Sequence, residues 1–230
     1  MSSVAGSTPR TSGGSADFGA TVRGVLLAPA TGFVAALRRV ESSAEGRSTY
    51  VLGAIGGASV VVLWLKVSGL FGLREVPASD FSWSVFAAVL FLAALLGVAS
   101  QVVWSFAASR AGGPDAASPR SFRAVWALSS FPHLPVLLLL LPLDLVFVGG
   151  RAFTTDAIGD SVSTAWVALS TAAALSLGVW AAYVFVRGTH AATRAGAGRT
   201  AAVVALAVAT SAALALLLLM GLGALSQVAS

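Results

Sequence analysis

The 230-residue sequence contains no cysteine and very little charge. Without cysteine there is no disulfide, no thiol nucleophile and no Cys-ligated metal. Charged residues make up 10% and hydrophobic residues 57%, against about 25% and 45–50% in soluble proteins. Such a chain has too few charges to cover its apolar surface, so it must either be buried in lipid or aggregate. This composition excludes a disordered chain, a coiled coil, a collagen and a secreted disulfide scaffold.

Catalytic signatures are also missing from the sequence. There is no H-E-x-x-H zinc motif, no P-loop and no G-x-G-x-x-G fingerprint. No paired carboxylates lie inside an apolar stretch, and the chain has only two histidines. We therefore predict a protein that is not an enzyme, with no catalytic residues, no cofactor and no metal.

Long apolar runs dominate what is present. A helix needs about 20 apolar residues to cross a bilayer, and five stretches are long enough. They cover residues 50–73, 83–108, 125–148, 162–186 and 200–225. The sequence predicts an all-α fold, a polytopic membrane helix bundle with five transmembrane helices and an N-terminal amphipathic interfacial helix.

Arginine placement predicts the orientation of this bundle. Eleven of the 14 Lys and Arg residues fall in the N-terminal segment and in the loops after the second and fourth spans. Cytoplasmic loops carry such an excess of positive charge. We expect a multi-pass protein of the cell (plasma) membrane, with its N-terminus in the cytoplasm and its C-terminus outside.

The segment before the first span has two parts. Residues 1–16 are rich in Ser, Gly and Thr and are predicted to be a disordered cytoplasmic tail. Residues 17–48 are predicted to be a cytoplasmic or interfacial amphipathic segment, followed by the membrane domain over 49–226. Pro29 suits the first turn of a helix, and Phe33 lies on its apolar face.

Arg38 and Arg39 lie off that apolar face, within reach of anionic lipid head groups. Pro29, Phe33, Arg38 and Arg39 are therefore the predicted partner or head-group contacts. The alternative is a cytoplasmic helix that packs on the base of the bundle.

The order of these parts resembles a known family. An LL-x-P-x-x-x-F box (Leu26, Leu27, Pro29, Phe33) precedes five short-looped spans, and the third span opens with the Ser- and Pro-rich run 129–135. This resembles the bacterial branch of the Yip family, the Ypt/Rab-GTPase-interacting multi-spanning membrane proteins, over residues 24–225. The resemblance implies the five-span fold and binding of protein partners at the cytoplasmic face.

The GTPase-binding box of the eukaryotic members is acidic and aromatic. Only its Leu and Pro carry over to residues 26–29 here. The resemblance therefore implies a membrane organiser or adaptor and leaves GTPase binding open.

Polar residues inside the spans are the candidate site, because they are costly in lipid. These are Ser129, Ser130, His133, Asp144 and Gln101. Pro132 and Pro135 break the third span and free carbonyl groups that neighbouring side chains can satisfy. The alternatives are a packing kink for His133, an interfacial position for Asp144 and a helix-to-helix hydrogen bond for Gln101.

Two further patterns have simple structural interpretations. Lys66 lies about two thirds of the way along the first span, and we interpret it as snorkelling to the outer interface, with an ion pathway as the alternative. Small residues line the first span at 53–57 and the fourth at Ser170, Ala174 and Gly178. They predict close packing within the bundle, with homo-oligomer contact as the alternative.

The leading functional hypothesis is a non-enzymatic adaptor with the lipid bilayer, anionic head groups and membrane or cytoplasmic proteins as partners. Arginines in the inner loops stand without stacking aromatics, so nucleic acid is not expected as a partner. The alternative is a small transporter or permease component with its site at the proline-broken third span. A lipid-modifying enzyme is a third hypothesis, for which no nucleophile stands out.

Overall fold

A computed structural model describes residues 14–42, 45–70, 82–111, 119–149, 161–193 and 195–228. Every regular element within these ranges is a helix. The elements are α1 (Gly14–Leu27), α2 (Pro29–Ser42), α3 (Glu45–Leu70), α4 (Trp83–Ala111), α5 (Pro119–Ser129), the 3-10 turn η2 (Phe131–His133), the π turn η3 (Val136–Leu140), α6 (Leu141–Phe147), α7 (Ser161–Thr193) and α8 (Ala197–Val228).

Three segments are long and apolar enough to cross a membrane. They are Arg123–Phe147, Val162–Thr193 and Ala197–Leu214, and the first is the most deeply buried. Tyr50–Lys66 and Trp83–Ala99 are shorter apolar segments of the described residues. The all-helical fold and its membrane character agree with the sequence-based prediction.

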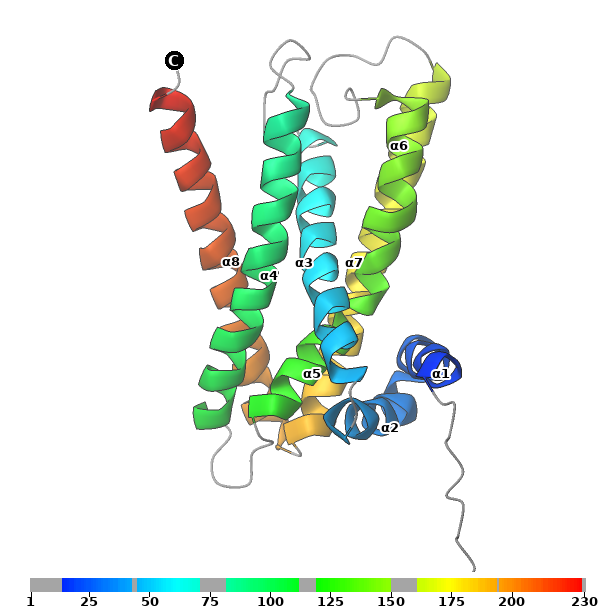
Figure 1. The fold of residues 1–230 in the computed structure, drawn as a ribbon, viewed down its shortest axis with the longest axis vertical. Helices are drawn as coiled ribbons and strands as arrows, with labels where there is room; N and C mark the ends of the chain where they lie inside the picture. The colour runs from blue at the N-terminus through cyan, green and yellow to red at the C-terminus, as the bar shows by residue number, and fades with distance from the viewer. Residues whose placement is uncertain are drawn as a thin grey trace, which may run out of the picture.

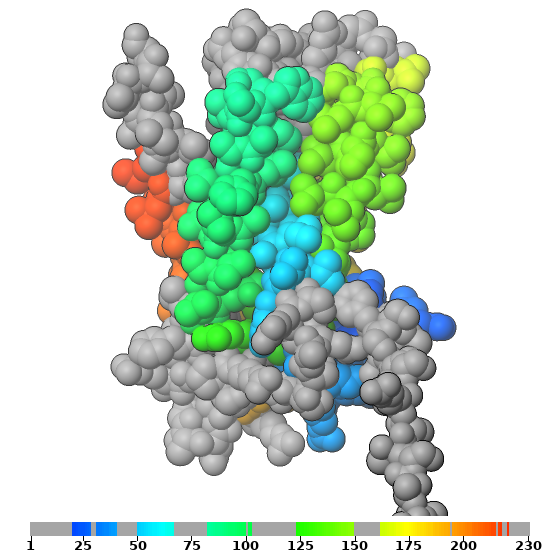
Figure 2. Space-filling model, viewed as in Figure 1, coloured from blue at the N-terminus to red at the C-terminus, as the bar shows by residue number. Residues whose placement is uncertain are grey.

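The long helices stand side by side, and α1 and α2 lie across one end of them (Figure 1). α8 ends at the opposite end (Figure 1). α3 is the central helix, because it contacts α2, α4, α5, η2, η3 and α7. Figure 2 shows its surface between α4 and α6.

Glycines allow the neighbours of α3 to approach closely. A Cβ atom at Gly57 would lie 3.1 Å from the Cα of Gly97 on α4. A Cβ at Gly56 would lie 2.5 Å from the Cβ of Ser130. The predicted packing of this stripe within the bundle is therefore confirmed, since these glycines meet residues of the same chain.

The third apolar segment is broken and comprises α5, η2, η3 and α6. We call residues 119–147 the broken segment. Pro132 and Pro135 have no N–H group to donate, so α-helical hydrogen bonding stops near them. The chain continues as a 3-10 turn and then as a π turn. In the π turn, the N–H of Leu141 donates to the carbonyl of Val136. The proline-broken span predicted from the sequence is thus present as a change of helix type.

The N-terminal helices are packed against the base of the bundle. α2 begins at Pro29, as its sequence predicts, and the chain turns at Ala28 after α1. Phe33 and Val40 of α2 share a buried cluster with Leu128 of α5 and Val184 of α7. This contact corresponds to the alternative of a helix packed on the bundle base. The last residues of the predicted tail, 14–16, belong to α1; the rest of it, residues 1–13, lies outside the described residues.

Candidate functional site: a buried charged cluster

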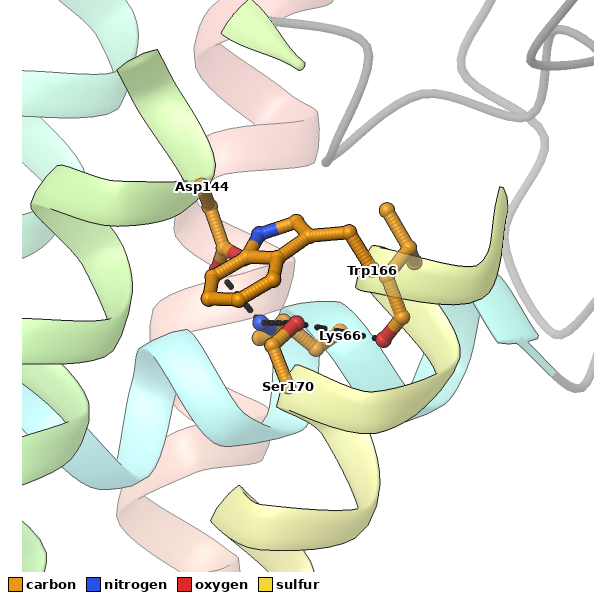
Figure 3. A network of polar contacts seen from close by, with 5 residues as sticks. Lys66, Asp144, Trp166 and Ser170 are labelled. Atoms are coloured by element: carbon orange, nitrogen blue, oxygen red, sulfur yellow. Dashed lines mark hydrogen bonds and ion pairs between the residues drawn. The ribbon is translucent and has the colours of Figure 1, made fainter. Parts of the chain in front are cut away.

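A lysine and a carboxylate meet inside the bundle, at the end opposite to α2. The Nζ of Lys66 on α3 donates to Oδ2 of Asp144 on α6 and, at 2.7 Å, to Oγ of Ser170 on α7. The Nε1 of Trp166 on α7 donates to Oδ1 of the same aspartate at 3.0 Å. Figure 3 shows how the four side chains converge from three helices. We call Lys66, Asp144, Trp166 and Ser170 the charged cluster.

Both charged side chains are fully enclosed by protein. The exposed fraction is 1% for the side chain of Lys66 and 0% for that of Asp144. Two interpretations from the sequence are therefore wrong: Lys66 does not snorkel to the interface, and Asp144 is not an interfacial residue. Lys66 stays inside because a counter-ion and a hydroxyl on two neighbouring helices replace the water it would otherwise reach.

Local sequence positions each member of the cluster. Trp166 and Ser170 are four residues apart, so they lie on one face of α7, the face that also carries Ala174. Ser170 donates its own proton to the carbonyl of Val167 at 3.1 Å, which aims its oxygen lone pairs at Lys66. Phe147 on α6 packs on the Trp166 ring at a centroid distance of 4.9 Å.

Within the cluster, charge and hydrogen bonding are balanced. Each carboxylate oxygen of Asp144 has a donor, and the ammonium group has two acceptors. A buried pair of this kind is stable only while both partners remain, because each charge alone would be stranded without solvent. The cluster therefore joins α3, α6 and α7 at one point and leaves no net charge there.

The serines of the broken segment do not join this cluster. Ser129 and Ser130 are buried, and both hydroxyls donate to the carbonyl of Trp126, at 2.9 and 3.0 Å. His133 lies at the break, with its Cε1 3.8 Å from where a Cβ of Gly178 would be. Its Nδ1 is buried and has no hydrogen-bond partner among the described residues.

Gln101 occupies a third place. It is buried on α4, and its Nε2 lies 2.5 Å from where a Cβ of Gly53 would be, at the crossing of α4 with α3. Asp144 is 11 residues beyond His133, about 16 Å along a helix. The five polar residues predicted as one site are therefore spread over three places, and only Asp144 belongs to the charged cluster.

The predicted contacts on α2 divide into two groups. Phe33 is wrong as a partner or lipid contact: its ring is fully buried against Gly188, where an added Cβ would lie 2.3 Å from the ring. Arg38 and Arg39 are exposed, as expected. Pro29 is the first residue of α2, and the structure describes nothing of its side chain.

Sequence reasoning missed Lys66, Trp166 and Ser170 as members of a site. Lys66 was assigned to the outer interface and Ser170 to a packing face, and Trp166 was assigned to no site. One signal was available in the sequence: the first and third spans each hold a single charge, of opposite sign and near their outer ends. Two such charges in lipid favour each other as partners.

The part of the chain that the structure describes holds no group of three or more His, Asp or Glu side chains placed to bind a metal. Comparisons with protein-family models, with curated proteins and with solved structures find no match to this chain.

Proposed function

We propose that the chain is a five-span membrane protein with a cytoplasmic N-terminus, and that it serves as a non-enzymatic adaptor of the Yip kind. Beside the three long apolar segments, two further helices support this count: α3 and α4 have 26 and 29 residues and would extend about 39 and 44 Å. The hydrocarbon core of a bilayer is about 30 Å thick.

A pair of single-cysteine variants tests the orientation. The chain has no cysteine of its own, so each introduced thiol is the only one. Val162 is exposed at the start of α7, and Gly198 is exposed at the start of α8, at the other end of the bundle. We expect a membrane-impermeant maleimide to label V162C in intact cells and G198C only after permeabilisation. The reverse pattern would place the N-terminus outside.

One observation carries the adaptor proposal: α2 is fixed to the bundle through its apolar side and presents arginines outward. Phe33 and Val40 are buried, whereas Arg38 and Arg39 are exposed on the same helix. A helix held in this way is a preformed surface, which loses little conformational entropy when a partner binds. Its positive charge suits an acidic segment of a partner protein.

Photo-crosslinking from α2 tests this surface. A photoreactive residue at the exposed position Ala35 is expected to capture a defined protein in native membranes. Arg38→Glu should abolish that adduct, because it reverses the charge beside the probe. Arg187→Glu on α7 is the matched control and should leave the adduct unchanged. Adducts with phospholipid alone would contradict the adaptor and assign the arginines to head groups.

A second candidate function is solute or ion passage through the bundle. The observation that favours it is a change of helix type in the broken segment, together with the buried charged cluster to which Asp144 of that segment belongs. In proteoliposomes the chain would then carry a flux that His133→Ala and Asp144→Leu each abolish. Equal flux in liposomes with and without the protein, tested for protons and alkali cations, would remove this candidate.

A further inference from the structure

The π turn η3 lies directly before the helix that carries Asp144. A π turn holds one residue more than the α-helical turn it replaces. If that extra residue passed out of η3, the rest of the segment would turn about the helix axis by about 100° and slide by about 1.5 Å. The setting of α6, by which we mean its rotation about its own axis relative to α3 and α7, therefore depends on the π turn.

Prolines on both sides lower the cost of such a change. Pro135 precedes η3 and Pro142 is the second residue of α6. Neither has an N–H group, so the hydrogen-bond ladder of this stretch is already incomplete. A rearrangement between them breaks fewer backbone hydrogen bonds than it would in an uninterrupted helix.

Apolar packing of α6 changes little with its setting: Leu141 is buried in a cluster with Val62 and Val136, and Leu140 would take its place after a one-residue turn. Leu143 and Leu145, the neighbours of Asp144, are partly buried, and Val146 is 79% exposed. Loss of the extra residue from η3 moves each residue of α6 to the place of the next one. Leu143 would then take the place of the carboxylate, opposite Lys66, and Leu145 would take the exposed place of Val146. Among Leu143–Phe147 the position of the charge distinguishes the settings, because leucines can fill similar volumes.

We propose that the broken segment contains a one-residue register switch: the π turn Val136–Leu140 allows α6 to rotate, and the charged cluster holds α6 in the observed setting. Asp144 reaches Lys66 on α3 and Trp166 on α7 in this setting alone. Buried polar groups set the register of packed helices in the same way elsewhere. The inference goes beyond the adaptor function and does not depend on the α2 surface.

A nitroxide on α6 measures this rotation. The label is attached to Leu145→Cys in the cysteine-free chain, reconstituted in phosphatidylcholine vesicles. In the wild-type background we expect one spectral component with low oxygen accessibility, because Leu145 is partly buried. In Lys66→Met/Asp144→Leu we expect a second, more mobile component with raised oxygen accessibility, because residue 145 then takes the place of Val146, which is 79% exposed. That variant removes the cluster without leaving a charge unpaired.

Deletion of Leu138 supplies the decisive comparison. Removing one residue from the π turn converts it into an α-helical turn and leaves the orientation of α6 unchanged. In the doubly substituted chain the deletion should therefore restore the single component. A spectrum of Lys66→Met/Asp144→Leu identical to wild type would overturn the proposal. So would a second component that persists after the deletion.

Two controls separate rotation from loss of the fold. A label at Val179, exposed on α7, should report no change in any variant. Ser176→Ala removes a hydroxyl that bonds only within α7 and should leave the label at position 145 as in wild type. If the Val179 label does change, Trp166→Phe replaces the double substitution, because it removes one donor and retains the ion pair. Absence of the second component in Trp166→Phe would then overturn the proposal.

Discussion

Removal of Lys66 alone should destabilise the protein far more than removal of the whole ion pair. Lys66→Met leaves the carboxylate of Asp144 fully buried with the Nε1–H of Trp166 as its donor within the cluster. Breaking a buried pair from one side costs about 3–5 kcal/mol of unfolding free energy, because a charge is stranded away from water.

Replacing both partners removes that penalty. In Lys66→Met/Asp144→Leu no charge remains, and Ser170 retains its bond to the carbonyl of Val167. The main loss is the acceptor of the Trp166 N–H group, a hydrogen bond with a net value of about 0.5–1.5 kcal/mol. The double variant should therefore be more stable than Lys66→Met by roughly 2 kcal/mol or more.

The assay is reversible unfolding in mixed micelles by titration with a denaturing detergent. Helicity by circular dichroism and the fluorescence of the six tryptophans provide two independent probes. Ser176→Ala is the matched control and should stay within about 0.5 kcal/mol of wild type, as surface substitutions usually do. A Lys66→Met variant within 1 kcal/mol of wild type, or a double variant no more stable than the single one, would refute the reasoning.

Two glycine contacts yield further predictions. Gly188→Ala should displace the Phe33 ring, loosen α2 and speed tryptic cleavage after its arginines, because the new Cβ would lie 2.3 Å from the ring. Gly56→Ala should cost about 1–3 kcal/mol of unfolding free energy through overpacking against Ser130. Gly198→Ala is the control for both: a Cβ there meets nothing within 4 Å, and alanine should be neutral or stabilising by about 1 kcal/mol. Unchanged cleavage in Gly188→Ala, or equal stability of the two alanine variants at 56 and 198, would contradict the contacts.

The positions of the helices followed closely from the sequence. The predicted span 83–108 lies within α4 (Trp83–Ala111), and the span 162–186 lies within α7 (Ser161–Thr193). Long apolar runs specify helices because every backbone polar group must find a partner within the segment. Proline signals were local as well, and they predicted both the start of α2 and the break in the third span.

The role of Phe33 could not be read from the sequence. Its helical spacing defines an apolar face, but the same face suits a lipid interface and a protein neighbour equally. Gly188 decided between them, since only a residue without a side chain leaves room for the ring on α7. Gly188 lies 155 residues after Phe33, and no local sequence pattern connects the two.

The charged cluster also combines features that the sequence determined with features that only the tertiary structure decided. Composition and hydropathy by themselves determined a helical membrane protein, and they marked Lys66 and Asp144 as costly residues within its spans. Tertiary structure alone decided that the two meet, because the pairing depends on the π turn that sets the rotation of α6 and on the face of α7 that supplies Trp166 and Ser170. Helix formation is governed by near neighbours along the chain, whereas helix rotation is governed by contacts between segments distant in sequence.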